Sequence, residues 1–111
     1  MEHTAKQTVL AFLGALNDEN FDAAGGYLND NVSFRGVLGS RDGADTYIAD
    51  MRKMKFKYEI LKVFDDATDV CVWYNIDMSG SKILTSGWYQ LQNNKISHIR
   101  VLFDPRPLLE K

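Results

Sequence analysis

The chain has one cysteine, Cys71, among its 111 residues, and this scarcity excludes an intrachain disulfide. A protein without disulfides fits a reducing compartment, so we expect it in the cytoplasm. Cys71 lies in an apolar run, residues 70–74, where a thiol usually packs as an inert side chain. The first residues, MEHTAKQ, contain no apolar run of the length that a secretory signal requires.

The chain also has little excess of charge of one sign, few histidines and no long apolar run. The 13 basic and 15 acidic residues leave a net charge of -2, whereas a nucleic-acid-binding domain usually carries a basic stripe. Two histidines without clustered carboxylates offer no metal site, and no glycine-rich phosphate loop is present. No segment is apolar over the length of a bilayer span. We therefore expect no metal, no cofactor, no nucleic acid and no membrane among its partners.

The first half of the chain is typical of three short helices. Thr4 and Gln7 have the spacing of a capping box, and a helical apolar stripe follows them: Val9, Phe12, Leu13 and Leu16. Asn20 is placed to cap a second helix, which Gly25-Gly26 weaken. After a short strand near Val32, the segment GVLGSRDG predicts a turn with Ser40 or Asp42 as the N-cap of a third helix. The stripe of that helix is Ala44, Tyr47, Ile48, Met51 and Met54.

From Lys55 onward the apolar period becomes two, which predicts strands. Strand-like segments cover residues 56–60, 70–78, 83–92 and 96–103, with polar turns at 65–69, 79–81 and 93–94. Helices followed by an antiparallel meander indicate a single α+β domain over residues 1–111. The last two strands carry few charges on either face, so we expect helices on one face of the sheet and a partner on the other.

Three segments resemble the nuclear-transport-factor-2-like superfamily: FLGALNDENFDAAGGYLNDNVSF, GSRDGADTYIADM and NNKISHIRVLFDPRPLLEK. Ketosteroid isomerases, limonene epoxide hydrolases and SnoaL-like polyketide cyclases belong to it. The resemblance spans essentially the whole chain. It implies a cone-shaped fold in which three N-terminal helices pack in a curved antiparallel sheet and enclose a deep, mostly apolar pocket. Activity does not follow from such a fold, because the chemistry lies in particular pocket residues.

The positions that carry the known chemistries of this superfamily are mostly replaced. The three functional positions of a ketosteroid isomerase match Phe12, Arg35 and Gly87. Limonene epoxide hydrolases use an arginine and two aspartates, and these positions match Asn75, Asp77 and Val101. No inward residue matches the pocket acid/base of SnoaL-like cyclases. The resemblance therefore implies a pocket without the known isomerase or epoxide hydrolase catalytic sets.

The same alignment predicts which strand residues face the pocket: Trp73, Asn75, Asp77, Thr85, Gly87, Tyr89, Ile99, Val101 and Phe103. It places His98 and Arg100 on the outer face. An offset of one residue would turn every side chain of a strand to the other face. The expected ligand-binding residues are Phe12, Trp73, Asn75, Tyr89, Val101 and Phe103.

Asp77 and Arg35 are the candidate catalytic residues. Desolvation of Asp77 between Trp73 and Phe103 would suit it to general acid/base chemistry, although it could equally be a solvated residue at a strand end. Arg35 could bind a carboxylate or phosphate of a ligand, or it could pair with Asp77 or Asp104 and close the pocket mouth.

Two functions are compatible with these residues. We favour a small pocket protein that binds a hydrophobic or carbonyl-bearing small molecule. The alternative is an isomerase, cyclase or dehydratase type of enzyme in which Asp77 is the general acid/base and Arg35 or Tyr89 polarises the substrate. For either function, we expect a homodimer through the outer face of the sheet.

Overall fold

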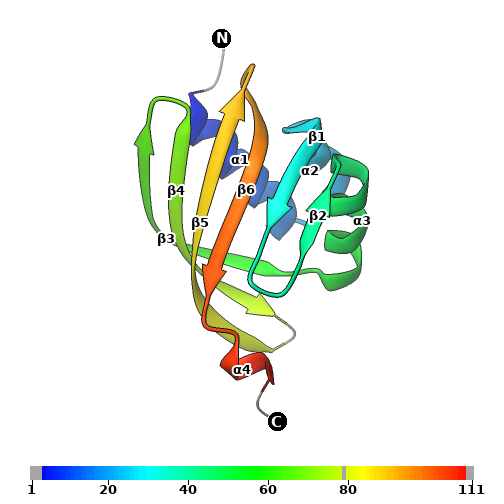
Figure 1. The fold of residues 1–111 in the computed structure, drawn as a ribbon, viewed down its shortest axis with the longest axis vertical. Helices are drawn as coiled ribbons and strands as arrows, with labels where there is room; N and C mark the ends of the chain where they lie inside the picture. Colours follow the sequence, from blue (N-terminus) through cyan, green and yellow to red (C-terminus); the bar gives the residue numbers. More distant parts are fainter. Residues whose placement is uncertain (1–3, 79, 110–111) are drawn as a thin grey trace.

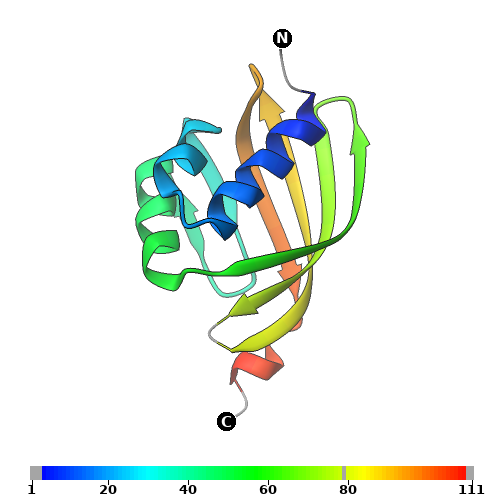
Figure 2. The same ribbon diagram turned by 180° about the vertical axis from the view of Figure 1, so that it is seen from behind.

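The structure, a computed structural model, describes residues 4–78 and 80–109. Its elements are α1 (Ala5–Asn17), α2 (Phe21–Gly26), β1 (Leu28–Arg35), β2 (Ser40–Asp42), α3 (Ala44–Met54), β3 (Lys57–Asp66), β4 (Asp69–Met78), β5 (Ser81–Gln92), β6 (Lys95–Phe103) and α4 (Arg106–Leu109). Helices α1, α2 and α3 pack on one face of a curved, open sheet (Figure 1; Figure 2). The predicted α+β fold, with three N-terminal helices and a curved sheet, is confirmed.

The sheet has six strands in the order β2-β1-β6-β5-β4-β3. The meander from β3 to β6 is antiparallel as predicted, and β2 also pairs with β1 in an antiparallel direction. Strand β1, however, pairs with β6 in parallel, so the sheet is mixed. This pairing joins segments far apart in the chain, and the local apolar period holds no information about it.

The caps of the first two helices are those that the sequence predicts. The Gln7 amide N–H donates to Thr4 Oγ1 at 3.1 Å, and the Thr4 N–H donates to Gln7 Oε1 at 2.9 Å. The Asn20 side chain accepts a hydrogen bond from the Ala23 N–H. The apolar stripe of α1 is buried against the sheet, so the helix is fixed at both its cap and its face.

The predicted cap of the third helix is wrong. Residue Gly43, with a φ of 94°, precedes α3, and no side chain caps the helix. Ser40 and Asp42 instead belong to β2, which pairs with the end of β1. The turn that the sequence predicts here is therefore a short hairpin, and its connecting residues, 36–39, form a loop.

Strand β3 does not keep a single alternation of inward and outward side chains. Its pairing with β4 shifts between Ile60 and Lys62, which marks a bulge. Tyr58 packs on the core before the bulge and Val63 packs on it afterwards, while Ile60 and Leu61 between them are exposed.

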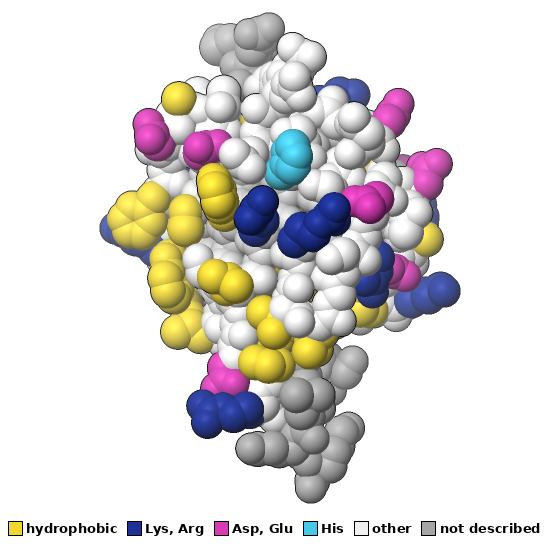
Figure 3. Space-filling view, in the orientation of Figure 1, with side chains coloured by type: hydrophobic (Ala, Val, Ile, Leu, Met, Phe, Trp, Pro, Cys, Tyr) yellow, Lys and Arg dark blue, Asp and Glu magenta, His cyan; other side chains and the backbone are white. Residues whose placement is uncertain are grey.

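Large apolar side chains are exposed on the face of the sheet that the helices do not cover (Figure 3). We call this the outer apolar face; its residues are Phe64, Trp73, Leu84, Trp88 and Leu102. His98 and Arg100 are exposed on the same side, as predicted. Across residues 4–78 and 80–109, no helix is long and apolar enough to cross a membrane.

Candidate functional site

A pocket with a cavity volume of about 340 Å³ opens between α3, the inner face of the sheet and the loop 36–39. This volume is at the lower end of the range for small-molecule sites. The lining is mostly apolar and aromatic and consists of Phe34, Gly36, Val37, Leu38, Gly39, Arg41, Tyr47, Met51, Met54, Phe56, Tyr58, Tyr74, Ile76, Met78, Tyr89, Val101 and Phe103.

Helix α3 and the start of β3 form one wall of the pocket. Tyr47, Met51 and Met54 lie on one side of the helix because they are four and three residues apart. The chain leaves α3 through Lys55 in the left-handed conformation, with a φ of 52°. The Asn17 side chain at the end of α1 then accepts a hydrogen bond from the Tyr58 N–H at 2.7 Å and donates one to the Tyr58 carbonyl at 2.9 Å. Both contacts fix Tyr58 at the pocket.

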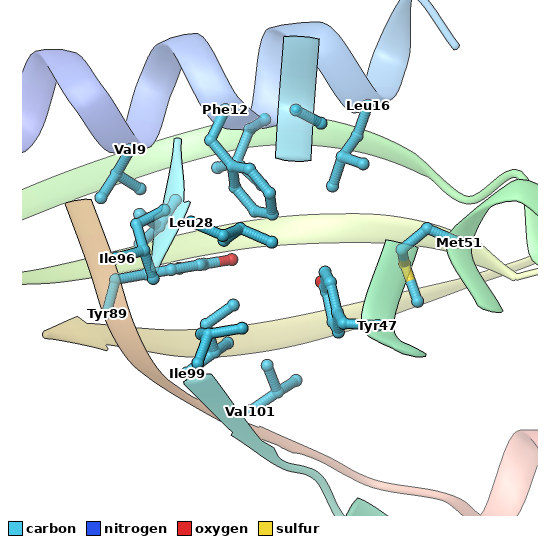
Figure 4. Close-up of a cluster of buried hydrophobic side chains, with 14 of the residues drawn as sticks. Val9, Phe12, Leu16, Leu28, Tyr47, Met51, Tyr89, Ile96, Ile99 and Val101 are labelled. Carbon is cyan, nitrogen blue, oxygen red and sulfur yellow. The ribbon is translucent and has the colours of Figure 1, made fainter. Parts of the chain in front are cut away.

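Four tyrosines meet in this pocket: Tyr47 from α3, Tyr58 from β3, Tyr74 from β4 and Tyr89 from β5. The hydroxyls of Tyr74 and Tyr89 are hydrogen-bonded at 2.7 Å, and both side chains are buried. Figure 4 shows Tyr47 and Tyr89 reaching into the space beneath Phe12. Burial raises the pKa of all four hydroxyls above the usual value, so they are neutral and can donate hydrogen bonds at pH 7.

Gly87 makes the contact between Tyr74 and Tyr89 possible. A Cβ at this position would overlap the Tyr74 hydroxyl and lie 3.0 Å from its Cζ and 2.9 Å from Tyr89 Cε1. Strand β5 therefore needs a residue without a side chain where the Tyr74 ring crosses it.

Among the described residues that line the pocket, Arg41 is the one with a charged side chain, and it comes from β2. Its Nε donates to a carboxylate oxygen of Asp50 on α3, and its Nη1 donates to the Ser40 carbonyl at 3.0 Å. Both members of the ion pair are about one-third exposed. The pair ties β2 to α3 at the margin of the pocket.

Strands β5 and β6 present the faces that the sequence predicts. Tyr89, Val101 and Phe103 line the pocket, while Thr85, Gly87 and Ile99 lie on the same inner face. Phe12 lies behind the lining, where its ring packs against those of Tyr47 and Tyr89 at centroid distances of 6.2 and 6.4 Å. It supports the wall of the pocket without lining it.

The predicted face of β4 is wrong by one residue. Tyr74, Ile76 and Met78 point inward, and Trp73, Asn75 and Asp77 point away from the pocket. The reason is the length of the hairpin turn. A three-residue turn over 79–81 would pair Asn75 with Thr85, but Met78 pairs with Ser81, so Tyr74 lies opposite Thr85. Ser79 itself lies outside the described residues.

Neither candidate catalytic residue faces the pocket. Asp77 Oδ1 accepts a hydrogen bond from the Gly80 N–H at 2.9 Å, so it stabilises the hairpin turn. Arg35 is half-exposed and pairs with Asp42 at 2.9 Å rather than with Asp77 or Asp104. On the outer side of the sheet, Asn75 donates to Glu59 at 3.1 Å.

The pocket residues that the sequence alignment does not find include Tyr47, Tyr58, Tyr74 and Arg41. A signal for Tyr74 was present: the face of β4 that contains it (Val70, Val72, Ile76 and Met78) has no charged or amide side chain, whereas the other face has Asn75 and Asp77. No alternation of apolar and polar side chains indicates Arg41, because it follows the glycine-containing loop 36–39 in a strand of only three residues. Within the described ranges, no group of three or more His, Cys, Asp or Glu side chains is placed to hold a metal ion.

Comparisons with known proteins agree with this architecture. No family model and no curated protein matches the chain. The structure is similar to an NTF2-like protein of unknown function from Cytophaga hutchinsonii, with 47% identity and a TM-score of 0.97 over 99% of this chain and 98% of that chain. The chain therefore belongs to the NTF2-like family.

Two more distant structures share the fold. An LEH-like epoxide hydrolase from M. tuberculosis has 22% identity and a TM-score of 0.82, covering 96% of this chain and 86% of that chain. An NTF-2 like protein of unknown function from Burkholderia xenovorans has 17% identity and a TM-score of 0.79, covering 90% and 82%. At these identities the likeness shows the fold alone, and the function has to be argued from the pocket.

Proposed function

We propose that this protein binds a small, largely apolar molecule in the pocket and that an uncharged oxygen of this molecule, such as a carbonyl, accepts a hydrogen bond from the Tyr74–Tyr89 pair. The observation that carries the proposal is this buried pair of hydroxyls at the wall of an otherwise apolar cavity.

The hydrogen-bond count of the pair explains its preference for an acceptor. Two neutral hydroxyls carry two protons, and their mutual hydrogen bond uses one of them. Within the described part of the chain, neither hydroxyl has another hydrogen-bond partner. One O–H therefore remains to donate, and a buried donor without an acceptor is unfavourable. A ligand oxygen would satisfy it.

The pocket favours binding over acid/base catalysis. Among the described residues that line it there is no carboxylate and no imidazole. Asp77, the general acid/base of the alternative enzyme hypothesis, contacts the hairpin turn instead. Its predicted place beside the cavity is wrong, so we do not propose it as a catalytic residue.

Calorimetric titration with two neutral esters, methyl decanoate and methyl cinnamate, tests the binding proposal. We expect at least one ester to bind, and the double variant Tyr74→Phe/Tyr89→Phe to bind it roughly threefold to tenfold more weakly, as expected for one lost hydrogen bond. Replacing both hydroxyls avoids leaving either one unpaired in the core. Tyr27→Phe and Asp77→Asn are controls outside the pocket and should bind as the wild type does. Failure of both esters to bind, or unchanged affinity in the double variant, would contradict the proposal.

We also propose that two copies associate through the outer apolar face. Its exposed tryptophans and leucines form the kind of patch that marks an interaction site. A symmetric interface must be complementary to itself, and this side of the sheet carries both signs of charge: Asp66 and Asp69 at one corner, and Arg100 beside the Trp88 ring. A second copy is therefore the occupant that we infer.

The molar mass in solution tests this association. Wild-type protein should sediment as a dimer, and Leu102→Glu should shift it to the monomer because a charge would be buried in the interface. Leu38→Glu is the matched control, since Leu38 is similarly exposed but lies at the pocket. A monomeric wild type at tens of micromolar would reject the proposal.

A further inference from the structure

We propose that the ligand is an acid: a small, mostly apolar carboxylate whose charged end binds Arg41 while its apolar body lies in the pocket. This inference rests on the proposed function, because it concerns the same pocket. It adds the charge of the ligand and a second point of attachment.

The charge of the pocket lining is the first argument. Arg41 is its one charged side chain among the described residues, and the four tyrosines are neutral. Asp50, which pairs with Arg41, does not belong to the lining. A ligand in the cavity therefore meets a positive group and no negative one.

The hydrogen bonds of Arg41 are the second argument. A guanidinium has five N–H donors in a rigid fork. Its bonds to Asp50 and to the Ser40 carbonyl use Nε and Nη1, and Nη2 has no acceptor within the described residues. Asp50 thus holds the group in place while part of its donor edge stays open. The Arg41 side chain is therefore already ordered when a carboxylate binds to it, and this lowers the entropic cost of binding.

The shape of the pocket is the third argument. Gly39 lies next to the guanidinium, and a Cβ there would be only 3.0 Å from Arg41 Nη1. Arg41 is partly exposed, whereas Tyr74 and Tyr89 are almost fully buried. The polar groups of the pocket therefore differ in depth, with the cation near solvent and the hydroxyls inside. This polarity fits a molecule with an acidic end at the mouth, and an uncharged oxygen at its inner end would add a hydrogen bond from the tyrosine pair.

The neighbouring Arg35 provides a matched control. It lies beside Arg41 in the β1–β2 hairpin, where Phe34 is opposite Arg41 and Arg35 is opposite Ser40. Arg35 also pairs with an aspartate, Asp42, but it is outside the pocket lining. Arg35→Gln and Arg41→Gln thus change the net charge equally, and only one of them changes the pocket.

The experiment compares two acids with their methyl esters, decanoic acid with methyl decanoate and cinnamic acid with methyl cinnamate, by titration calorimetry at neutral pH. In the wild type, we expect one of the acids to bind about tenfold more tightly than its ester. Arg41→Gln should remove this preference and leave the affinity for the ester unchanged, while Arg35→Gln should alter neither. Binding of the acid, but not of the ester, should weaken as salt concentration rises.

Asp50→Asn separates an anchoring role of Arg41 from a structural one. It breaks the same ion pair but keeps the cation, so acid binding should remain at least as tight as in the wild type. If Arg41→Gln fails to fold, Asp50→Asn still tests whether Arg41 anchors the acid. Weaker acid binding in Asp50→Asn, or equal binding of acid and ester in the wild type, would overturn this inference. If the esters bind through the tyrosines but the acids bind no better, the proposed function stands and only the inference falls; if no acid and no ester binds, both fall.

Discussion

Gly87 shows how a single residue decides the chemistry of this pocket. The Tyr74 hydroxyl occupies the space that a side chain at position 87 would need, and there it forms its hydrogen bond with Tyr89. A larger residue would exclude the hydroxyl pair even if both tyrosines were kept. At the scale of the residue, the pocket thus depends on an absent side chain as much as on those that are present.

Gly87→Ala tests this dependence. The added methyl group should displace the Tyr74 ring and lower the free energy of unfolding by about 1–3 kcal/mol, as overpacking does in other cores. It should also weaken ester binding. Urea denaturation measures the first effect and calorimetry the second.

Two further variants complete the test. The double variant Gly87→Ala/Tyr74→Phe lacks the hydroxyl that clashes with the added methyl group. Its loss of unfolding free energy should therefore be smaller than the sum of the losses in the two single variants. Gly14→Ala is the control, because nothing lies within 4 Å of a Cβ on this exposed helical glycine; it should stabilise by up to about 1 kcal/mol. Equal effects of the two glycine variants would contradict the role of Gly87.

At the scale of the element, the β4–β5 hairpin and the loop 36–39 shape the site. The hairpin turn sets which face of β4 looks inward, and one residue more in the turn would exchange Tyr74 for Trp73 or Asn75. The loop contributes Val37 and Leu38, two apolar side chains that are exposed although they line the pocket. Exposed apolar side chains beside an apolar cavity gain burial only when a ligand is present.

Leu38→Ser should therefore weaken ligand binding and hardly affect stability. We expect an affinity loss of roughly threefold to tenfold for the esters, with a change in unfolding free energy within about 0.5 kcal/mol. Leu84→Ser is the matched control, because Leu84 is 55% exposed and Leu38 is 57% exposed, but Leu84 lies on the outer apolar face. If both variants bind the esters as the wild type does, the loop does not contact the ligand.

At the scale of the whole molecule, the buried tyrosines link stability to pH. Their pKa is raised in the folded state because burial disfavours the phenolate, whereas the same residues ionise near pH 10.0 in the unfolded chain. Above that pH the unfolded state binds fewer protons than the folded state, so the free energy of unfolding falls as the pH rises. Below about pH 9 both states hold these protons, and the contribution does not vary.

Urea denaturation between about pH 8 and pH 11 measures this linkage. The slope should approach about 1.4 kcal/mol per pH unit for each tyrosine that stays protonated only in the folded state. The Tyr74→Phe/Tyr89→Phe variant should lose stability less steeply above pH 10, because two of these groups are gone. Parallel curves for the variant and the wild type would show that these hydroxyls ionise alike in both states.

Most of the fold could be predicted because it follows from local patterns. The Thr4–Gln7 capping box, the stripe of α1 and the alternation in β5 and β6 each involve residues that are near one another in the chain. The candidate site could be predicted only in part. Tyr89, Val101 and Phe103 were found, but Asp77 and Arg35 were placed beside a pocket that neither of them lines.

The sequence by itself determined the helices and the meander, since short-range spacing is enough to set these, and three of its segments resemble the NTF2-like family to which the chain belongs. Only the tertiary structure decided which face of β4 turns inward, which tyrosines meet and which arginine faces the cavity. These features depend on strand register and on contacts between distant segments, such as Arg41 with Asp50 and Tyr74 with Tyr89. A shift of one residue in register preserves every local pattern and yet exchanges the whole set of side chains in the pocket.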